Sequence, residues 1–91
     1  MSGLLSEKYI DCYKSLSSPV RLKILLLLLN YNLDVTNLSK KLNVKQPNIS
    51  QHLLKLKRNQ LVNCTKLGKK RIYVVTEFGK KFLSYLVNMK L

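Results

Sequence analysis

The first apolar positions of the chain recur every three or four residues. Leu5, Tyr9, Cys12 and Leu16 have this spacing, which places them on one side of a helix. We therefore expect an amphipathic helix over residues 4–16.

A second helix is expected to begin at Ser18-Pro19, because serine caps helix N-termini and proline is tolerated in the first turn. It continues to about Leu29. Its second half, Ile24–Leu29, is apolar on every side, and a helix without a polar face is normally buried all round. This helix is therefore expected to form the centre of the core.

Two short helices separated by a tight turn follow. Thr36 can cap the first, which ends near Leu42, and Asn43 suits the left-handed conformation that often ends a helix. Gln46-Pro47 marks the start of the second helix only two residues later. This arrangement predicts a helix-turn-helix.

The second of these helices, over about residues 46–59, has two different sides. The apolar side is expected to pack on the core and consists of Ile49, Leu53 and Leu56. The opposite row carries amides and cations, namely Asn48, Gln51, Lys55 and Arg58. An ordinary solvated face would normally include Glu or Asp, and this row has neither. Amides read base edges and cations bind phosphates, so the row is a candidate surface for nucleic acid.

Two β-branched and apolar segments, residues 61–67 and 71–75, predict a β-hairpin. Gly68-Lys69-Lys70 separates them. Four cations lie at the tip of this hairpin, namely Lys66, Lys69, Lys70 and Arg71. A hairpin tip with this charge can lie along a sugar-phosphate backbone.

The C-terminal segment predicts a helix over about residues 77–90 with a broad apolar stripe. Leu83 and Val87 widen this stripe beyond what a domain of this size easily covers. We therefore expect a homodimer held by this helix and the first one. The residues expected to make the dimer contacts are Leu5, Tyr9, Phe78, Phe82, Tyr85, Leu86 and Met89.

The charge of the chain is as uneven as its hydrophobic pattern. The chain has 91 residues, which fits one domain, and it carries 17 Lys and Arg against four Asp and Glu, a net charge of +13. Residues 35–76 contain ten of the cations and no acid. A solvated basic surface would also explain such a run, but the lack of any compensating acid favours a polyanionic partner.

Other partners and activities fit the sequence less well. The longest uninterrupted apolar run, Ile24–Leu29, has six residues, far short of the ~20 that span a bilayer. No secretory leader and no disulfide framework are recognisable, so we expect a cytoplasmic protein without a membrane partner. The chain has neither a phosphate-binding glycine loop nor a catalytic spacing of Ser, Cys, His and acids, which argues against an enzyme.

Three segments together resemble the ArsR family of winged helix-turn-helix repressors. Leu16–Leu25 resembles the start of that family's core helix, Gln46–Leu56 its recognition helix, and Gly68–Tyr73 its wing. The resemblance covers residues 14–86. It implies a mainly α-helical fold with a small β-hairpin, in the order of four helices, two strands and a fifth helix. It also implies a homodimer that binds operator DNA and releases it when an effector or a metal arrives.

The resemblance also implies roles for individual residues. The base-reading positions correspond to Gln46, Asn48, Ser50 and Gln51. His52 matches a histidine that is common in the family and is expected to be packed and hydrogen-bonded, and Gln60 replaces a glycine that usually ends the helix. The cations expected to bind phosphates are Lys45, Lys55, Arg58, Lys66, Lys69, Lys70 and Arg71.

The metal-sensing residues of the family are not recognisable here. Its metal sensors carry Cys-x-Cys-Asp where this chain has residues 34–37, Asp-Val-Thr-Asn. A zinc or soft-metal site needs about four nitrogen or sulfur donors, and the chain has one His and two Cys. We therefore expect no metal and no other cofactor, and the sequence names no small effector. Cys12 and Cys64 could form a thiol switch, although Cys12 on an apolar stripe is expected to be a buried, inert thiol.

The sequence thus predicts one winged helix-turn-helix domain over residues 1–91 that binds double-stranded DNA as a homodimer. A repressor is the expected regulator, because binding over a promoter blocks it. The alternative is a winged-helix module that binds protein or RNA without operator specificity. RNA readers usually present aromatic platforms, and Tyr73 is the one aromatic residue in the acid-free segment, so duplex DNA is favoured.

Overall fold

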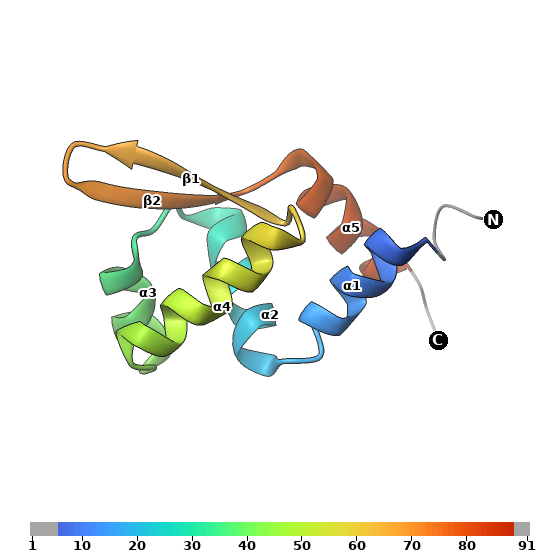
Figure 1. Cartoon of the computed structure of the whole chain (residues 1–91), viewed down its shortest axis with the longest axis horizontal. Coiled ribbons are helices and arrows are strands. Elements are labelled where there is room, and N and C mark those ends of the chain that lie inside the picture. Colours follow the sequence, from blue (N-terminus) through green and yellow to red (C-terminus); the bar gives the residue numbers. More distant parts are fainter. Residues whose placement is uncertain (1–5, 89–91) are drawn as a thin grey trace.

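The computed structural model describes residues 6–88 and has the order of elements that the sequence predicts (Figure 1). The mainly α-helical fold class with one small hairpin is confirmed. Four helices come first, namely α1 (Glu7–Ser15), α2 (Pro19–Asn30), α3 (Val35–Leu42) and α4 (Gln46–Arg58). They are followed by the antiparallel strands β1 (Val62–Leu67) and β2 (Lys70–Val75), and then by α5 (Glu77–Asn88). No helix among these residues is long and apolar enough to cross a membrane.

Local side-chain signals set the helix boundaries. The Ser18 hydroxyl accepts a hydrogen bond from the Arg21 backbone N–H at 3.4 Å, and α2 begins at Pro19 as predicted. The predicted Thr36 cap is wrong, because the Asp34 carboxylate accepts the Asn37 N–H at 2.9 Å and α3 already begins one residue before Thr36. Asn43 has the expected left-handed conformation, with φ 55°.

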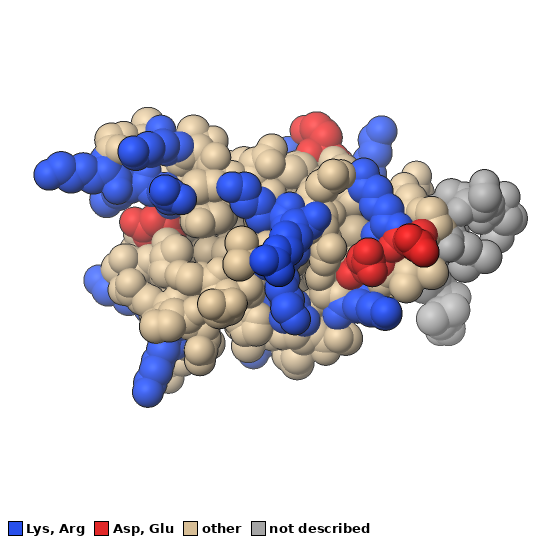
Figure 2. All heavy atoms as spheres, in the orientation of Figure 1, with Lys and Arg blue, Asp and Glu red and all other residues tan. Residues whose placement is uncertain are grey.

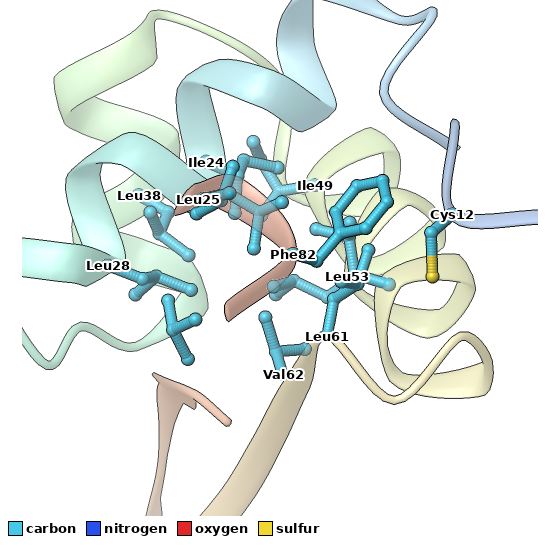
Figure 3. Close-up of a cluster of buried hydrophobic side chains, with 13 residues drawn as sticks. Cys12, Ile24, Leu25, Leu28, Leu38, Ile49, Leu53, Leu61, Val62 and Phe82 are labelled. Atoms are coloured by element: carbon cyan, nitrogen blue, oxygen red, sulfur yellow. The ribbon is translucent and has the colours of Figure 1, made fainter. Parts of the chain in front are cut away.

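The core lies between α2, α4 and α5, with α3 and β1 closing its sides (Figure 3). The expectation that α2 is buried all round is wrong, since Leu26 is 49% and Leu29 40% exposed. A chain this short has too few elements to surround a helix completely. The largest side chains that are fully buried are Ile24, Leu25, Leu38, Ile49, Leu53, Leu56, Leu61 and Phe82.

The turn between α4 and the hairpin adopts a left-handed conformation without a glycine. Gln60 has φ 62°, at the position where the family resemblance leads us to expect glycine. The turn is held on both sides: the Leu61 N–H donates to the Leu56 carbonyl at 2.9 Å, and the Thr76 hydroxyl donates to the Gln60 carbonyl at 2.6 Å. Hydrogen bonds to the backbone therefore keep the hairpin in place at some cost in backbone strain.

Gln60→Gly is expected to raise the free energy of unfolding by about 0.5–1 kcal/mol. A left-handed residue with a Cβ costs roughly 1–2 kcal/mol, and part of the gain is offset because glycine has more freedom when unfolded. Urea denaturation of the two proteins measures the difference. Gln60→Ala is the matched control and should give no gain, since alanine keeps the Cβ. A destabilised Gln60→Gly protein would contradict this explanation of the turn.

The hairpin is anchored at its base by α5 and by the loop before α3. Strand β2 reaches this loop through the Tyr73 N–H, which donates to the Leu33 carbonyl at 2.9 Å. On the other side, the Thr76 hydroxyl accepts the Gly79 N–H at 2.8 Å. A Cβ at Gly79 would lie 2.5 Å from the Leu61 carbonyl oxygen, so α5 packs directly against the chain that leads into β1. The hairpin tip extends away from these contacts (Figure 1).

Aromatic side chains pack α1 against α5. The ring centroids of Tyr9 and Phe78 are 5.6 Å apart, and those of Tyr13 and Phe82 are 5.0 Å apart. Phe82 is 0% exposed and Tyr85 42%. The expected dimer contact through Phe82 therefore needs correction, because one chain already buries this ring completely. Two other expected contact residues, Leu5 and Met89, lie outside the described residues.

Candidate nucleic-acid interface

Helix α4 has the two sides that its sequence predicts. Ile49, Leu53 and Leu56 are at most 1% exposed and face the core. The row of Asn48, Gln51, Lys55 and Arg58 is exposed. The four positions expected to read bases, Gln46, Asn48, Ser50 and Gln51, are also all exposed on the first two turns of the helix.

The seven cations expected to bind phosphates are exposed as well. Lys45 directly precedes α4, Lys55 and Arg58 lie in its last turns, and the remaining four lie on the hairpin. Figure 2 shows Lys and Arg side chains both at the hairpin and over the middle of the face that α4 occupies. The hairpin and α4 thus present positive charge on one side of the molecule.

A shallow cleft of about 240 Å³ joins α4 to the hairpin. It brings the candidate base readers Ser50 and Gln51 next to the hairpin cation Arg71. Leu54, which is 44% exposed, lines the same cleft and is partly covered there rather than in the core. The complete lining is Ser50, Gln51, Leu53, Leu54, Lys57, Arg71 and Tyr73.

The positive charge of this surface is not compensated by ion pairs with carboxylates in the described residues. The ion pair between Lys80 Nζ and Glu77 Oε1, at 3.5 Å, is the one found in residues 6–88, and it lies on α5. Asp34 is near the hairpin but acts as the α3 cap: the hydrogen bond from the Asn37 N–H lowers its pKa, and Lys70 adds to this effect. The cations of residues 35–76 are therefore available for a polyanionic partner.

A polar network fixes α4 against the first two helices. Arg21 donates from Nε to the Ser15 carbonyl at 2.6 Å, and its Nη1 lies 3.2 Å from His52 Nδ1. Arginine has only donors, so His52 Nδ1 is the acceptor. Burial lowers the pKa of His52, and the charges of Arg21 and Lys55 add to this, so the ring is neutral at pH 7. The prediction of a packed, hydrogen-bonded histidine is confirmed.

Sequence reasoning missed the part that Arg21 plays in this network. Arg21 and His52 are 31 residues apart, and the pattern around Arg21 indicates only the start of a helix. Asn59 extends the network: its side-chain amide donates to the Ser15 hydroxyl and, at 3.4 Å, to the Asp11 carbonyl. No periodic pattern signals contacts of this kind.

The two cysteines are both free. Cys12 is fully buried, and its thiol donates to the Asn59 carbonyl at 3.6 Å. Burial raises the pKa of Cys12, which keeps the thiol protonated and unreactive. Cys64 is half-buried on β1, opposite Tyr73. In the described part of the chain, no three His, Cys, Asp or Glu side chains are grouped to hold a metal ion.

These features define the class of protein. A tight helix-turn-helix, an exposed row of amides and cations on its second helix, and a basic hairpin beside that row form a DNA-binding winged helix-turn-helix. The model of bacterial regulatory proteins of the arsR family matches residues 18–63, half of the chain. The chain therefore belongs to the ArsR family of DNA-binding transcriptional regulators, whose members are not enzymes.

Individual relatives agree with this assignment. The transcriptional activator HlyU of Vibrio cholerae serotype O1 is 41% identical over 61 residues, which cover 67% of this chain but only 56% of that protein. The solved structure of HlyU from Vibrio vulnificus CMCP6 is 31% identical, with a TM-score of 0.77, and the match covers 99% of this chain and 95% of that one. These two relatives support both the family and the fold.

A third similarity concerns the fold alone. The homodimeric winged helix-turn-helix DNA-binding domain of Mb0332 from Mycobacterium bovis is 22% identical, with a TM-score of 0.81. The match covers 98% of this chain and 88% of that one. The winged helix-turn-helix architecture therefore extends over nearly the whole chain.

Proposed function

We propose that this protein binds a palindromic DNA site in a sequence-specific manner as a homodimer. The observation that carries the proposal is the cleft between α4 and the hairpin, where Ser50 and Gln51 lie beside Arg71. Base-edge readers and a phosphate-binding cation are thus close enough to engage one stretch of duplex together. In this arrangement α4 enters the major groove and the hairpin follows the backbone beside it.

The homodimer is proposed to form through α1 and α5. Ile10 on α1 and Tyr85 and Val87 on α5 are 40%, 42% and 76% exposed, and the ring centroids of Tyr85 and Tyr9 are 6.2 Å apart. A two-fold axis through this region would present two α4 helices about 34 Å apart, one turn of B-DNA. Tyr9, Phe78 and Leu86 remain proposed contacts because each is only partly buried. The buried Phe82 supports the surface from beneath.

The proposed division of roles follows the chemistry of the side chains. Gln46, Asn48, Ser50 and Gln51 read bases, and glutamine or asparagine pairs best with adenine. The ArsR family often has arginine at the position of Gln51, so this residue is proposed to shift preference from guanine to adenine. The cations of α4 and of the hairpin hold phosphates. Lys70 or Arg71 at the hairpin tip is suited to a narrow minor groove.

The sign of regulation is proposed to depend on where the DNA site lies. We expect repression where the site overlaps a promoter, because a bound dimer excludes the polymerase. HlyU of Vibrio cholerae is named as an activator, so a reporter assay with the native promoter must be able to detect either sign. One His and two Cys are too few nitrogen and sulfur donors for a zinc or soft-metal site within one subunit. This supports a regulator whose individual subunits do not sense a metal.

Gln51→Ala and Lys69→Ala are expected to affect DNA binding differently. Gln51→Ala should weaken binding to a duplex selected from a random pool by about 1–3 kcal/mol and leave a scrambled duplex almost unaffected. Lys69→Ala should weaken both duplexes alike, because phosphates carry no sequence information. Fluorescence anisotropy with both duplexes measures these effects, and Lys23→Ala, on the far side of α2 from Arg21, is the charge control. Equal losses on both duplexes for Gln51→Ala would contradict its role as a base reader.

A further inference from the structure

A second cleft lies on the opposite flank of α4 from the hairpin. At 100° per residue, Lys55 and the C-cap Asn59 lie toward one edge of the exposed side of α4, Ser50, Leu54 and Lys57 lie toward the other, and Arg58 lies between them. The hairpin therefore runs along one side of α4, and α1 with the start of α2 runs along the other (Figure 1). Of the candidate base readers, Gln51 lies near the middle of the exposed side and lines the hairpin cleft, and Asn48 lies toward the flank of the second cleft.

This second cleft has a volume of about 280 Å³ and is strongly cationic. Three helices contribute positive side chains to it, and Asp11 is its one carboxylate. The lining residues are Asp11, Lys14, Ser15, Arg21, Lys55, Arg58 and Asn59. Figure 2 shows the corresponding group of Lys and Arg over the middle of the molecule, between the hairpin and the acids near α1. Such an excess of positive charge in a concave surface favours an anion.

Two hydrogen bonds fix the Arg21 side chain in this cleft and leave one of its nitrogen atoms able to donate to a ligand. Its Nε and Nη1 are both engaged, by the Ser15 carbonyl and by His52. Within residues 6–88, Nη2 has no hydrogen-bond acceptor, and it belongs to a side chain that already lines the cleft. A guanidinium fixed in this way loses little conformational entropy when it binds an oxyanion.

The geometry of the DNA major groove indicates which part of the DNA would lie at this cleft. A helix in the major groove has a sugar-phosphate strand along each of its flanks, because this groove is only about 12 Å wide. The hairpin is placed to contact the strand on one flank. The strand on the other flank would pass the cleft formed by α1, α2 and α4.

We propose that this cleft binds a phosphodiester of the DNA backbone, on the strand opposite the one that the hairpin contacts. In this proposal Lys14 and Arg21 bind phosphate together with Lys55 and Arg58. The DNA-binding surface then extends to α1, which is one of the two helices of the proposed dimer contact. This inference rests on the proposed function, because it requires α4 to lie in a major groove.

Lys14→Gln is the variant that tests the proposal. Its side chain is exposed and makes no hydrogen bond or ion pair in the described residues, so the fold should be unaffected. The slope of log K against log salt should become shallower by about 0.9 for each phosphate that a subunit no longer binds, on selected and scrambled duplexes alike. Lys23→Gln is the matched control, because it removes the same charge from the side of α2 that faces away from the cleft, and it should leave the slope unchanged.

A scan of the DNA locates the phosphate. Single phosphates of the selected duplex are replaced by neutral methylphosphonates, and the affinity of each duplex is measured. Wild type and Lys23→Gln should share one sensitive phosphate per half-site that Lys14→Gln no longer senses. A Lys14→Gln protein with the wild-type slope and the wild-type map would overturn the inference and leave the proposed function intact. A wild-type protein that binds no duplex would overturn the proposed function itself.

Inorganic phosphate distinguishes a backbone contact from a site for a free anion. Phosphate is titrated into DNA-free wild type and Lys14→Gln, and amide chemical shifts around Arg21 and Asn59 are followed. A saturable response that Lys14→Gln abolishes, combined with unchanged DNA binding, would identify a free-anion site and contradict our assignment. A Lys14→Gln defect on DNA at a single phosphate position supports it.

Discussion

Raising the salt concentration from 50 to 200 mM is expected to weaken DNA binding by about 10³- to 10⁵-fold. Two subunits with seven candidate cations each can make on the order of 6–10 phosphate contacts, and each contact contributes about −0.9 to the slope of log K against log salt. The effect should be this large because residues 35–76 contain no acid and because none of their cations forms an ion pair in the described residues.

Anisotropy titrations over a salt series measure this slope for a selected and a scrambled duplex. The two slopes should be similar, since both reflect phosphates, while the affinities should differ. A double variant, Lys69→Ala with Lys70→Ala, should make the slope clearly shallower. A decrease in DNA affinity of less than tenfold over the same salt range would show that contacts between the cationic surface and phosphates do not supply the binding energy. That result would favour the protein- or RNA-binding alternative.

Phe82→Ala is expected to lower the free energy of unfolding by about 3–5 kcal/mol, a large share of the roughly 5–15 kcal/mol that stabilises a typical domain. Its ring is 0% exposed and packs on Tyr13, with ring centroids 5.0 Å apart. Truncation leaves a cavity between α1 and α5 that the surrounding helices can fill only in part. Urea unfolding followed by circular dichroism measures the decrease.

Tyr85→Ala is the matched comparison, because Tyr85 lies on the same helix but is 42% exposed. It should lower the free energy of unfolding by less than Phe82→Ala does, and only at protein concentrations at which wild type dimerises. It should also shift the monomer–dimer equilibrium measured by sedimentation. Phe82→Ala should instead lower stability at every protein concentration, since dimer contacts contribute through mass action and core contacts do not. A Phe82→Ala protein that folds normally but remains monomeric would place this ring in the subunit interface and contradict its position in the core.

Local signals in the sequence are sufficient for the order of elements. Ser18-Pro19, Asn43 and Gln46-Pro47 mark boundaries through their own backbone preferences, and the structure has helix boundaries at each of them. The two sides of α4 are also predictable, because helical periodicity alone separates Ile49 and Leu53 from the exposed row. The parts of the candidate site that lie on one helix or one hairpin therefore follow from sequence.

Contacts between distant segments are not predictable in the same way. Periodicity places Phe82 and Tyr85 on one stripe, but only the packing of the other elements around α5 decides that Phe82 is buried in the core and Tyr85 is 42% exposed. The same holds for Leu26 and Leu29, whose exposure depends on how far neighbouring elements reach. Arg21 joins His52 across 31 residues, and no local pattern indicates that pairing.

Selection of bound duplexes from a random pool tests the central claim most directly. Two α4 helices related by a two-fold axis should recover a palindromic consensus with half-sites centred about 10–10.5 base pairs apart, and the selected bases should include adenines opposite Gln51. A pool that shows no enrichment, or enriched sequences without two-fold symmetry, would contradict a homodimer that reads DNA through α4.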